Sequence, residues 1–216
     1  MKINYWADYA CPYCYIGEVR IKRAIKELGL SDKIHLNMFA YQLDPNAGQV
    51  AEGDMVTRLA NKYGITKEEA AERVSGVKEY AKEDGLDFDY TKVHFTNTLD
   101  AHRLTKFAME HLTIEEVDVL RMAIYKAYFE EHLELANHQV LLDIAKKAGL
   151  KVDQVEKFLN SSQYKDEVIE DQKEARSKDV KGVPCFVIGQ VMVPGAMSVE
   201  TFKDIIKQEL ENNHLY

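Results

Sequence analysis

Two cysteines separated by two residues are the feature of this sequence most able to do chemistry. Cys11-Pro12-Tyr13-Cys14 follows a short β-favouring segment and opens a segment with helical periodicity. At a helix N-terminus the free N–H groups and the helix dipole stabilise an anion, and a thiolate is such an anion. We therefore predict that Cys11 is a catalytic nucleophile. Cys14, one turn later, would attack a mixed disulfide on Cys11 and resolve it.

The residues between the cysteines and a distant proline complete the predicted substrate-binding set. Pro12 suits the first turn of a helix, where its missing N–H costs little, and Tyr13 places a ring beside the sulfurs. Val183-Pro184 precedes a later apolar strand. A cis peptide there would let the Val183 backbone face an extended substrate, and an ordinary trans loop is the alternative.

Cys185 and Trp6 are weaker candidates for accessory roles. Cys185 directly follows Pro184, so it is either a third redox thiol or a small buried strand residue, and we favour the second interpretation. Trp6 ends the first predicted strand, where it would either report the redox state of the cysteines or belong to the core.

His102 is a third accessory candidate. It lies between Asp100 and Arg103 on a predicted helix, from which it could hydrogen-bond the active-site region. Asp100 and Arg103 share a helix face at a spacing of three, so a structural ion pair is the favoured interpretation of this cluster.

Strands and helices of the two ends of the chain must position these residues. Residues 2–6 and 34–40 read as strands joined by a helix from Pro12 to Leu28, with Gly29 as its stop. This β-α-β order predicts two parallel strands. Near the C-terminus, residues 185–188 and 191–193 flank Gly189-Gln190, which predicts a β-hairpin before a last helix.

The middle of the chain reads differently. Residues 48–176 carry almost no strand signal, and capping-box patterns at Thr66…Glu69 and Thr113…Glu116 predict helix starts. We therefore expect an α/β fold in which a large all-helical insertion separates the two sheet-forming parts.

Composition narrows the possible functions. The 216 residues carry 28 Lys and Arg against 36 Asp and Glu, a net charge of −8, which argues against nucleic acid as a partner. Three cysteines exclude a disulfide scaffold, and without a second C-x-x-C or a spaced His pair we expect no metal site. No apolar run has the length of a membrane span, and no signal-peptide pattern is visible, so we expect no membrane partner and a cytoplasmic location.

Several motifs resemble the thioredoxin superfamily. Within it they look like the FrnE-type DsbA-like oxidoreductases, related to kappa glutathione transferases and 2-hydroxychromene-2-carboxylate isomerases. The resemblance rests on these segments: CPYC at 11–14, YQLDP at 41–45, NTLDAHR at 97–103, GVPCFVI at 182–188 and VPGA at 193–196.

The resemblance implies a thioredoxin fold with a helical insertion. Residues 1–47 and 177–216 would form the thioredoxin-like domain and residues 48–176 the insertion. Cys11 would be the nucleophile, Cys14 the resolving thiol and Pro184 the cis-proline. The strongly oxidising power of DsbA is associated with a His between the cysteines, whereas this chain has Pro12-Tyr13. We therefore expect a less oxidising potential.

The expected function is disulfide exchange with protein or peptide thiols. It needs no metal or organic cofactor, and a redox partner, glutathione among the candidates, would reset the cysteine pair. The alternative is a glutathione-dependent transferase or isomerase of the kappa or chromene-carboxylate type, whose members typically present Ser in place of Cys11. A chaperone role for the helical insertion is a third hypothesis, and either a monomer or a homodimer is compatible with the sequence.

Overall fold

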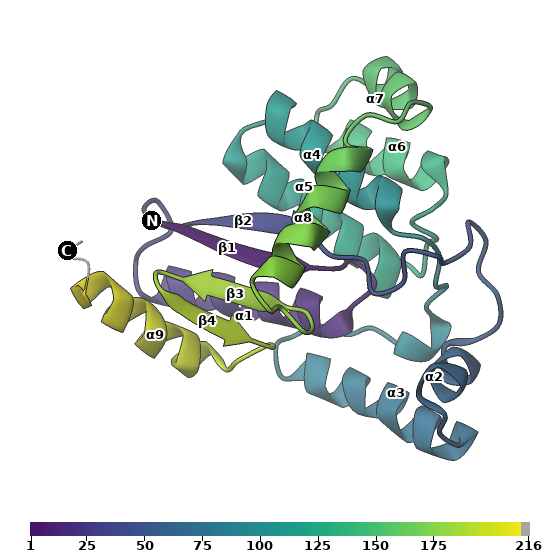
Figure 1. Cartoon of the computed structure of the whole chain (residues 1–216), viewed down its shortest axis with the longest axis horizontal. Helices are drawn as coiled ribbons and strands as arrows, with labels where there is room; N and C mark the ends of the chain where they lie inside the picture. The colour runs from purple at the N-terminus through teal and green to yellow at the C-terminus, as the bar shows by residue number, and fades with distance from the viewer. Residues whose placement is uncertain (213–216) are drawn as a thin grey trace. The chain divides into compact units, whose positions relative to one another are not determined.

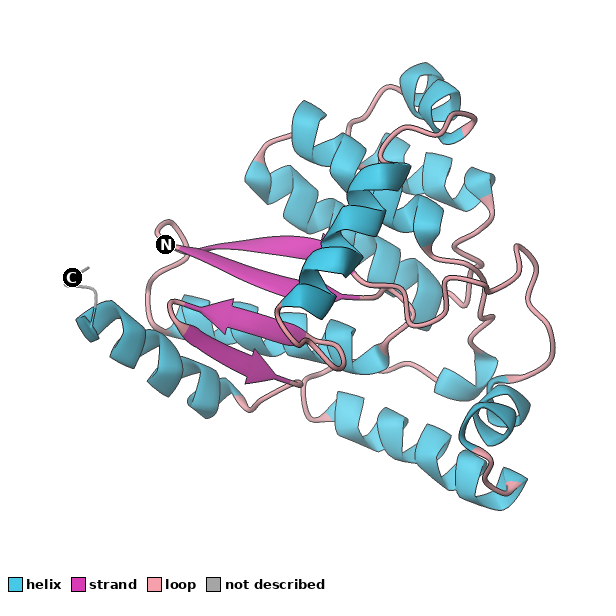
Figure 2. Ribbon diagram, in the orientation of Figure 1, coloured by secondary structure: helices cyan, strands magenta, loops and turns pink. Residues whose placement is uncertain are grey.

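The computed structural model describes residues 1–212, which fall into two compact units. Unit 1 comprises Met1–Leu43 and Asp166–Tyr216, and unit 2 comprises Asp44–Lys165. Figure 1 labels the elements along the chain, and Figure 2 shows the strands in magenta. Every strand of the described residues lies within the ranges of unit 1. The predicted order, β-α-β followed by helices and then β-β-α, is confirmed.

A four-stranded mixed sheet forms the centre of unit 1, with the order β2-β1-β3-β4. β1 (Lys2–Ala7) runs parallel to β2 (His35–Ala40) and antiparallel to β3 (Cys185–Ile188). β4 (Val191–Pro194) completes the hairpin with β3 at the sheet edge. Since β1 is central, the turn that follows it reaches the same end of the sheet as the start of β3, where Trp6 pairs with Cys185.

One face of the sheet is covered by α1 (Pro12–Glu27) and α9 (Val199–Asn212). The ring of Phe186 is 5.1 Å from the ring of Tyr5 and 5.1 Å from that of Phe202, and it also contacts α1 at Gly17. The Tyr5 hydroxyl donates a 2.6 Å hydrogen bond to the buried Glu18 carboxylate on α1. These contacts fasten the cysteine-bearing helix to the central strand.

The opposite face is covered by α8 (Lys165–Ser177), which crosses in front of the sheet in Figure 1, whereas α1 lies behind it. Trp6, Cys185, Ala175 and Val180 pack together there. The Trp6 indole N–H donates to the Asp171 carbonyl over 3.0 Å, and the Asp171 carboxylate accepts from the Ala40 N–H over 2.7 Å. Side chains of consecutive strand residues point to opposite faces, which is why Trp6 and Tyr5 enter different layers.

Helices joined by loops make up unit 2, and no strand lies between residues 44 and 165. Both predicted capping boxes are present, at the starts of α3 and α5. Its elements are α2 (Met55–Tyr63), α3 (Lys67–Lys82), the 3-10 helix η1 (Tyr90–Lys92), α4 (Leu99–His111), α5 (Ile114–Phe129), α6 (His138–Lys147) and α7 (Val152–Leu159).

The division between the units differs from the sequence prediction in the position of its boundaries. It falls after Leu43 and after Lys165, whereas the sequence analysis places it after residues 47 and 176. The physical reason is α8, whose charged sequence resembles the insertion but whose Asp171 bonds tie it to the ends of β1 and β2. Residues 213–216 of the predicted 177–216 segment lie outside the described residues.

Candidate functional site

Cys11 occupies the N-cap position of α1, at the turn that leaves β1. Its N–H donates to the Asp8 carbonyl over 3.0 Å, and its carbonyl accepts from Cys14 N–H at 3.0 Å and Tyr15 N–H at 3.4 Å. The Cys11 side chain makes no capping hydrogen bond, and Pro12 fills the first helical position. The Cys11 sulfur therefore lies at the positive end of the helix dipole, and it does not cap the helix through a hydrogen bond.

Cys14 is more deeply buried than Cys11, and the pKa of its thiol is raised. Cys14 has 0% of its surface exposed and Cys11 has 5%. Burial raises the pKa of the Cys14 thiol well above its ordinary value of 9.0, and the hydrogen bond and proximity to Cys11 raise it further. Because a thiolate is the nucleophile in disulfide exchange, this asymmetry favours Cys11 as the first sulfur to react and Cys14 as the second.

Tyr13 is the exposed member of the C-x-x-C segment. It has 44% of its surface exposed, whereas Pro12 is buried at the start of α1. The ring is therefore accessible to a molecule that approaches the cysteines, while Pro12 serves the helix start. Their role in binding substrate stays a prediction.

The loop before β3 brings Val183 and Pro184 to Cys11. The Val183–Pro184 peptide bond is cis, so the trans alternative is wrong. The Cys11 thiol donates to the Val183 carbonyl oxygen over 3.5 Å. Pro184 packs against α1 at Gly17, where an added Cβ would lie only 3.1 Å from the Pro184 Cγ. Because Gly17 has no side chain, the Pro184 ring can pack directly against the backbone of α1.

Asp8 is a site residue that the sequence analysis did not identify. It is 1% exposed, and its carboxylate accepts from Ala10 N–H at 3.3 Å and Leu43 N–H at 2.7 Å, so it holds the turn that presents Cys11. Its negative charge adds to the raised pKa of Cys14, while a backbone hydrogen bond from Asp8 acts in the opposite direction. The available signal was an acidic residue three positions before the first cysteine.

The arrangement of two cysteines at a helix start opposite a cis-proline can be compared with known families. A model of the DSBA-like thioredoxin domain matches residues 2–207. The chain belongs to the DsbA-like thioredoxin domain family. This match confirms the expected superfamily and fold: an α/β fold of the thioredoxin type, with a mixed sheet and a helical insertion.

Individual proteins that are similar to this chain match nearly its whole length. The Bacillus subtilis (strain 168) protein YwbO, an uncharacterized protein, is 23% identical over 209 residues, which are 96% of each chain. The probable DsbA oxidoreductase SCO1869 from Streptomyces coelicolor superposes with a TM-score of 0.88 at 29% identity, covering 98% of this chain and 90% of that one. A 2-hydroxychromene-2-carboxylate isomerase superposes with a TM-score of 0.74 at 15% identity over 100% of both chains, which shows a common fold.

Cys185 and Trp6 lie in the core of this DsbA-like sheet. Cys185 is 2% exposed and packs with Trp6 against α8, on the face opposite α1. Burial raises the pKa of the Cys185 thiol, which disfavours the thiolate that exchange requires. Although Cys185 adjoins Pro184 in sequence, strand alternation turns its side chain away from the layer of Cys11 and Cys14. The interpretation of both residues as core is the one that these contacts support.

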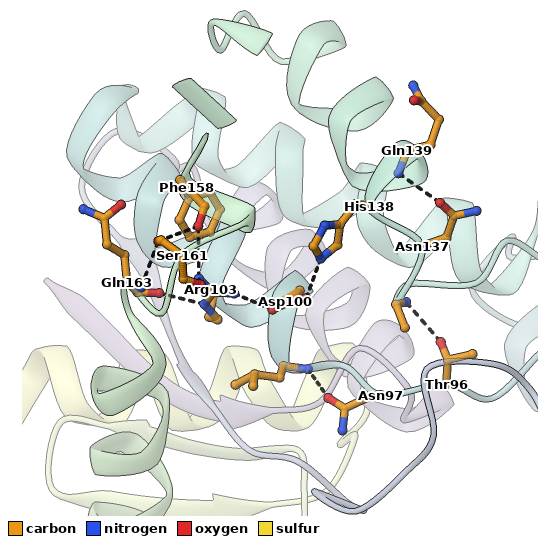
Figure 3. Close-up of polar contacts among 12 residues, drawn as sticks. Thr96, Asn97, Asp100, Arg103, Asn137, His138, Gln139, Phe158, Ser161 and Gln163 are labelled. Carbon is orange, nitrogen blue, oxygen red and sulfur yellow. Dashed lines mark hydrogen bonds and ion pairs between the residues drawn. The ribbon is translucent and has the colours of Figure 1, made fainter. Parts of the chain in front are cut away.

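Asp100 and Arg103, which flank His102 in the sequence, lie in unit 2, and Figure 3 shows their contacts. Asp100 accepts from Arg103 at 2.6 Å and contacts the His138 ring Nε2 at 2.8 Å. Arg103 is 4% exposed and also donates to the carbonyls that follow α7, at Ser161 (2.6 Å) and Gln163 (2.7 Å). The structural ion pair is therefore confirmed within α4, and the hydrogen bonds of Arg103 to the Ser161 and Gln163 carbonyls join α4 to the segment that follows α7.

His102 is buried inside unit 2, with 2% of its surface exposed, and its accessory role stays a prediction.

Among residues 1–212 there is no group of three or more His, Cys, Asp or Glu side chains placed to hold a metal ion. In the same part of the chain, no helix combines the length and apolar character needed to cross a membrane.

Proposed function

We propose that this DsbA-like protein is a dithiol–disulfide oxidoreductase that exchanges disulfides with protein or peptide thiols through Cys11 and Cys14. The observation that carries the proposal is the unequal pair: Cys11 at the helix N-cap within reach of the Val183 carbonyl, and a fully buried Cys14 with a raised pKa behind it.

The reaction begins at the Cys11 sulfur. As a thiolate it attacks one sulfur of a substrate disulfide, so a Cys11–substrate bond forms, the substrate S–S bond breaks, and the other substrate sulfur leaves as a thiolate that takes up a proton. Cys14 then loses its proton to water or to the departing thiolate and attacks the Cys11 sulfur. The second substrate thiol is released, and the enzyme retains a Cys11–Cys14 disulfide. Two electrons pass from enzyme to substrate, and the reverse sequence oxidises a dithiol substrate.

Val183 and Pro184 provide the place for an extended substrate. Val183 is half-buried, and its carbonyl oxygen lies 3.5 Å from the Cys11 sulfur. A peptide that paired with this backbone would bring its own cysteine to the reacting sulfur, which converts an encounter in solution into a positioned reaction. Tyr13, exposed beside the pair, would contact the same peptide.

The oxidised or reduced pair needs a partner that resets it. We propose glutathione or a thioredoxin-type system for this task, in a reducing cytoplasmic setting and without a metal or organic cofactor. Cell fractionation followed by trapping of the thiols with an alkylating reagent would show where the protein resides and which redox form it has there.

The alternative is a glutathione-dependent transferase or isomerase. The fold likeness to the 2-hydroxychromene-2-carboxylate isomerase is the observation that keeps this alternative in view. Such chemistry binds a thiol and does not require a resolving cysteine. A Cys14→Ser protein that retained glutathione-dependent turnover of an organic electrophile would favour it over disulfide exchange.

Insulin disulfide reduction and oxidation of reduced ribonuclease are the assays that test the proposal. We expect both activities in the wild type, their loss in Cys11→Ser, and stalled turnover in Cys14→Ser. Cys185→Ala is the matched control, because it removes a thiol from the opposite face of the sheet. If neither activity depends on Cys11, the proposed function is wrong.

A further inference from the structure

The loop that follows β4 continues the strand pairing toward the cis-proline. The last β3–β4 pair is Cys185 with Pro194, and one residue further the Gly195 N–H donates to the Pro184 carbonyl over 2.8 Å. Gly195 has a φ of +84°, a conformation that side-chain-bearing residues rarely adopt. The Gly195 backbone therefore holds Pro184 from the side of the sheet edge.

The next residue in the loop is held by the cysteine-bearing helix. Arg20, on α1, donates from Nη1 to the Ala196 carbonyl over 3.1 Å. Only 6% of Arg20 is exposed. A buried guanidinium is costly unless its N–H groups are hydrogen-bonded, and a hydrogen bond that involves a charged group is stronger than a neutral one. This contact is thus a firm link between α1 and the loop.

Helix α1 consequently contacts both Pro184 and the loop that follows β4. At Gly17 it supports the Pro184 ring directly, and at Arg20 it holds Ala196, the neighbour of the residue that binds the Pro184 carbonyl. The same helix begins at Cys11, whose thiol contacts Val183. The position of Val183 relative to the Cys11 sulfur is therefore set by contacts on both sides of the loop.

We propose that Arg20 is a positioning residue for disulfide exchange: through Ala196 and Gly195 it holds the Val183–Pro184 backbone in register with Cys11 and so favours extended peptide substrates. The inference rests on the proposed function and extends it to substrate class. A small disulfide needs only access to the Cys11 sulfur, whereas an extended chain must also pair with the Val183 backbone. Loss of Arg20 should therefore affect the two kinds of substrate differently.

Arg20→Met tests this on the full chain with two substrates, insulin and 2-hydroxyethyl disulfide. We expect the KM for insulin to rise roughly three- to tenfold, the size of effect that one ordinary hydrogen bond has, because Arg20 acts on the peptide only through the loop. The kcat/KM for the small disulfide should change by less than about twofold. Arg20→Lys, which retains a donor, should return much of the insulin KM toward the wild-type value.

Two further variants separate positioning from general stability. Lys26→Met removes an exposed cation from the last turn of the same helix. It should leave the KM for insulin and the kcat/KM for the small disulfide unchanged. Gly195→Ala weakens the other side of the loop by straining its left-handed backbone, and should reproduce the selective rise in insulin KM even if Arg20→Met does not fold.

The outcomes are distinguishable. If the wild type shows no Cys11-dependent reduction of insulin, the proposed function fails and the role of Arg20 fails with it. If the wild type is active but Arg20→Met and Gly195→Ala reduce insulin with the wild-type KM, only the role of Arg20 is overturned. An equal loss with both substrates would also overturn it, because that result indicates general damage to the fold.

Discussion

The Cys11 thiol donates a hydrogen bond to the Val183 carbonyl oxygen over 3.5 Å, across a sequence separation of 172 residues. The contact joins the start of α1 to the loop before β3. It places the sulfur that we propose to react first beside the backbone that we propose to bind a peptide, and Cys14 has no exposed surface. The following predictions depend on this arrangement.

The two active-site cysteines should have different mutant phenotypes. Cys11→Ser removes the proposed nucleophile, so the rate of insulin reduction should fall by more than about a hundredfold. Cys14→Ser leaves the first step intact, so a mixed disulfide between Cys11 and substrate should accumulate and be visible by mass spectrometry without reductant. A Cys11→Ser protein with the wild-type rate, or a Cys14→Ser protein that forms no mixed disulfide, would contradict the assigned roles.

The raised pKa of Cys14 should make the stability of the reduced protein depend on alkaline pH. The fold favours the neutral thiol, so the stabilising contribution is complete below the ordinary pKa of 9.0 and is lost as the pH rises through the higher folded value. Urea unfolding of reduced wild type and Cys14→Ala at about pH 8 and about pH 10 measures this. Any stability advantage of the wild type should shrink at the higher pH, and an unchanged difference would refute the prediction.

The redox potential should be less oxidising than the roughly −120 mV of DsbA. A strong oxidant requires extra stabilisation of its reduced thiolate, and Tyr13, which stands between the cysteines with 44% of its surface exposed, carries no positive charge to supply it. Equilibration of the Cys11–Cys14 pair with glutathione buffers gives the value. Tyr13→His should make the redox potential of the pair more oxidising. A wild-type potential near that of DsbA would contradict the prediction.

Gly17 should tolerate a methyl group poorly because Pro184 and Phe186 contact it. Gly17→Ala would place a Cβ 3.1 Å from Pro184 Cγ and 3.4 Å from the Phe186 ring. Overpacking costs roughly 1–3 kcal/mol, against a helix-propensity gain of about 0.5–1 kcal/mol, so a net loss of about 1 kcal/mol is expected. The matched control is Gly76→Ala in α3, where nothing lies within 4 Å. It should stabilise by about 0.5–1 kcal/mol, and equal gains at both positions would disprove the close approach.

Arg103 should be important for the stability of the helical insertion. Arg103→Met leaves the carbonyls of Ser161 and Gln163 without this donor and removes one of the two partners named for Asp100, so we expect the free energy of unfolding to fall by roughly 2–4 kcal/mol. Arg73→Met, on the exposed face of α3, should change the free energy of unfolding by less than about 0.5 kcal/mol. Urea denaturation compares the two variants, and similar small losses in both would show that the Arg103 contacts contribute little.

Local signals in the sequence were sufficient for most elements of the fold. A capping box, a proline at a helix start or a glycine after a helix end acts through hydrogen bonds within a few residues, so Thr66, Thr113, Pro12 and Gly29 mark the same boundaries in the sequence and in the structure. The position of Cys11 at the start of α1 was predictable for the same reason: Cys11 and the N–H groups of α1 are neighbours along the chain.

Contacts between distant segments were beyond the reach of such signals. α8 has the charged composition of the insertion, and only Asp171, bonded to Trp6 and Ala40, shows that it belongs with the sheet. Asp8 belongs to the candidate site because of two contacts of this kind. The parallel pairing of β1 with β2 brings Leu43 to its carboxylate, and the turn into α1 brings Cys14 near it. Neither relation depends on sequence spacing.

By itself, the sequence determined the chemistry available to this protein: two thiols one helical turn apart at a strand-to-helix junction. The tertiary structure decided which other residues take part. The sheet order brings the Val183 carbonyl to Cys11, and strand alternation sends the Cys185 side chain to the face opposite Phe186, where it packs with Trp6 instead of α1. Arg20 meets Ala196 only because α1 packs on the same face as the end of the β3–β4 hairpin. Local hydrogen bonding specifies elements, whereas the packing of those elements specifies the site.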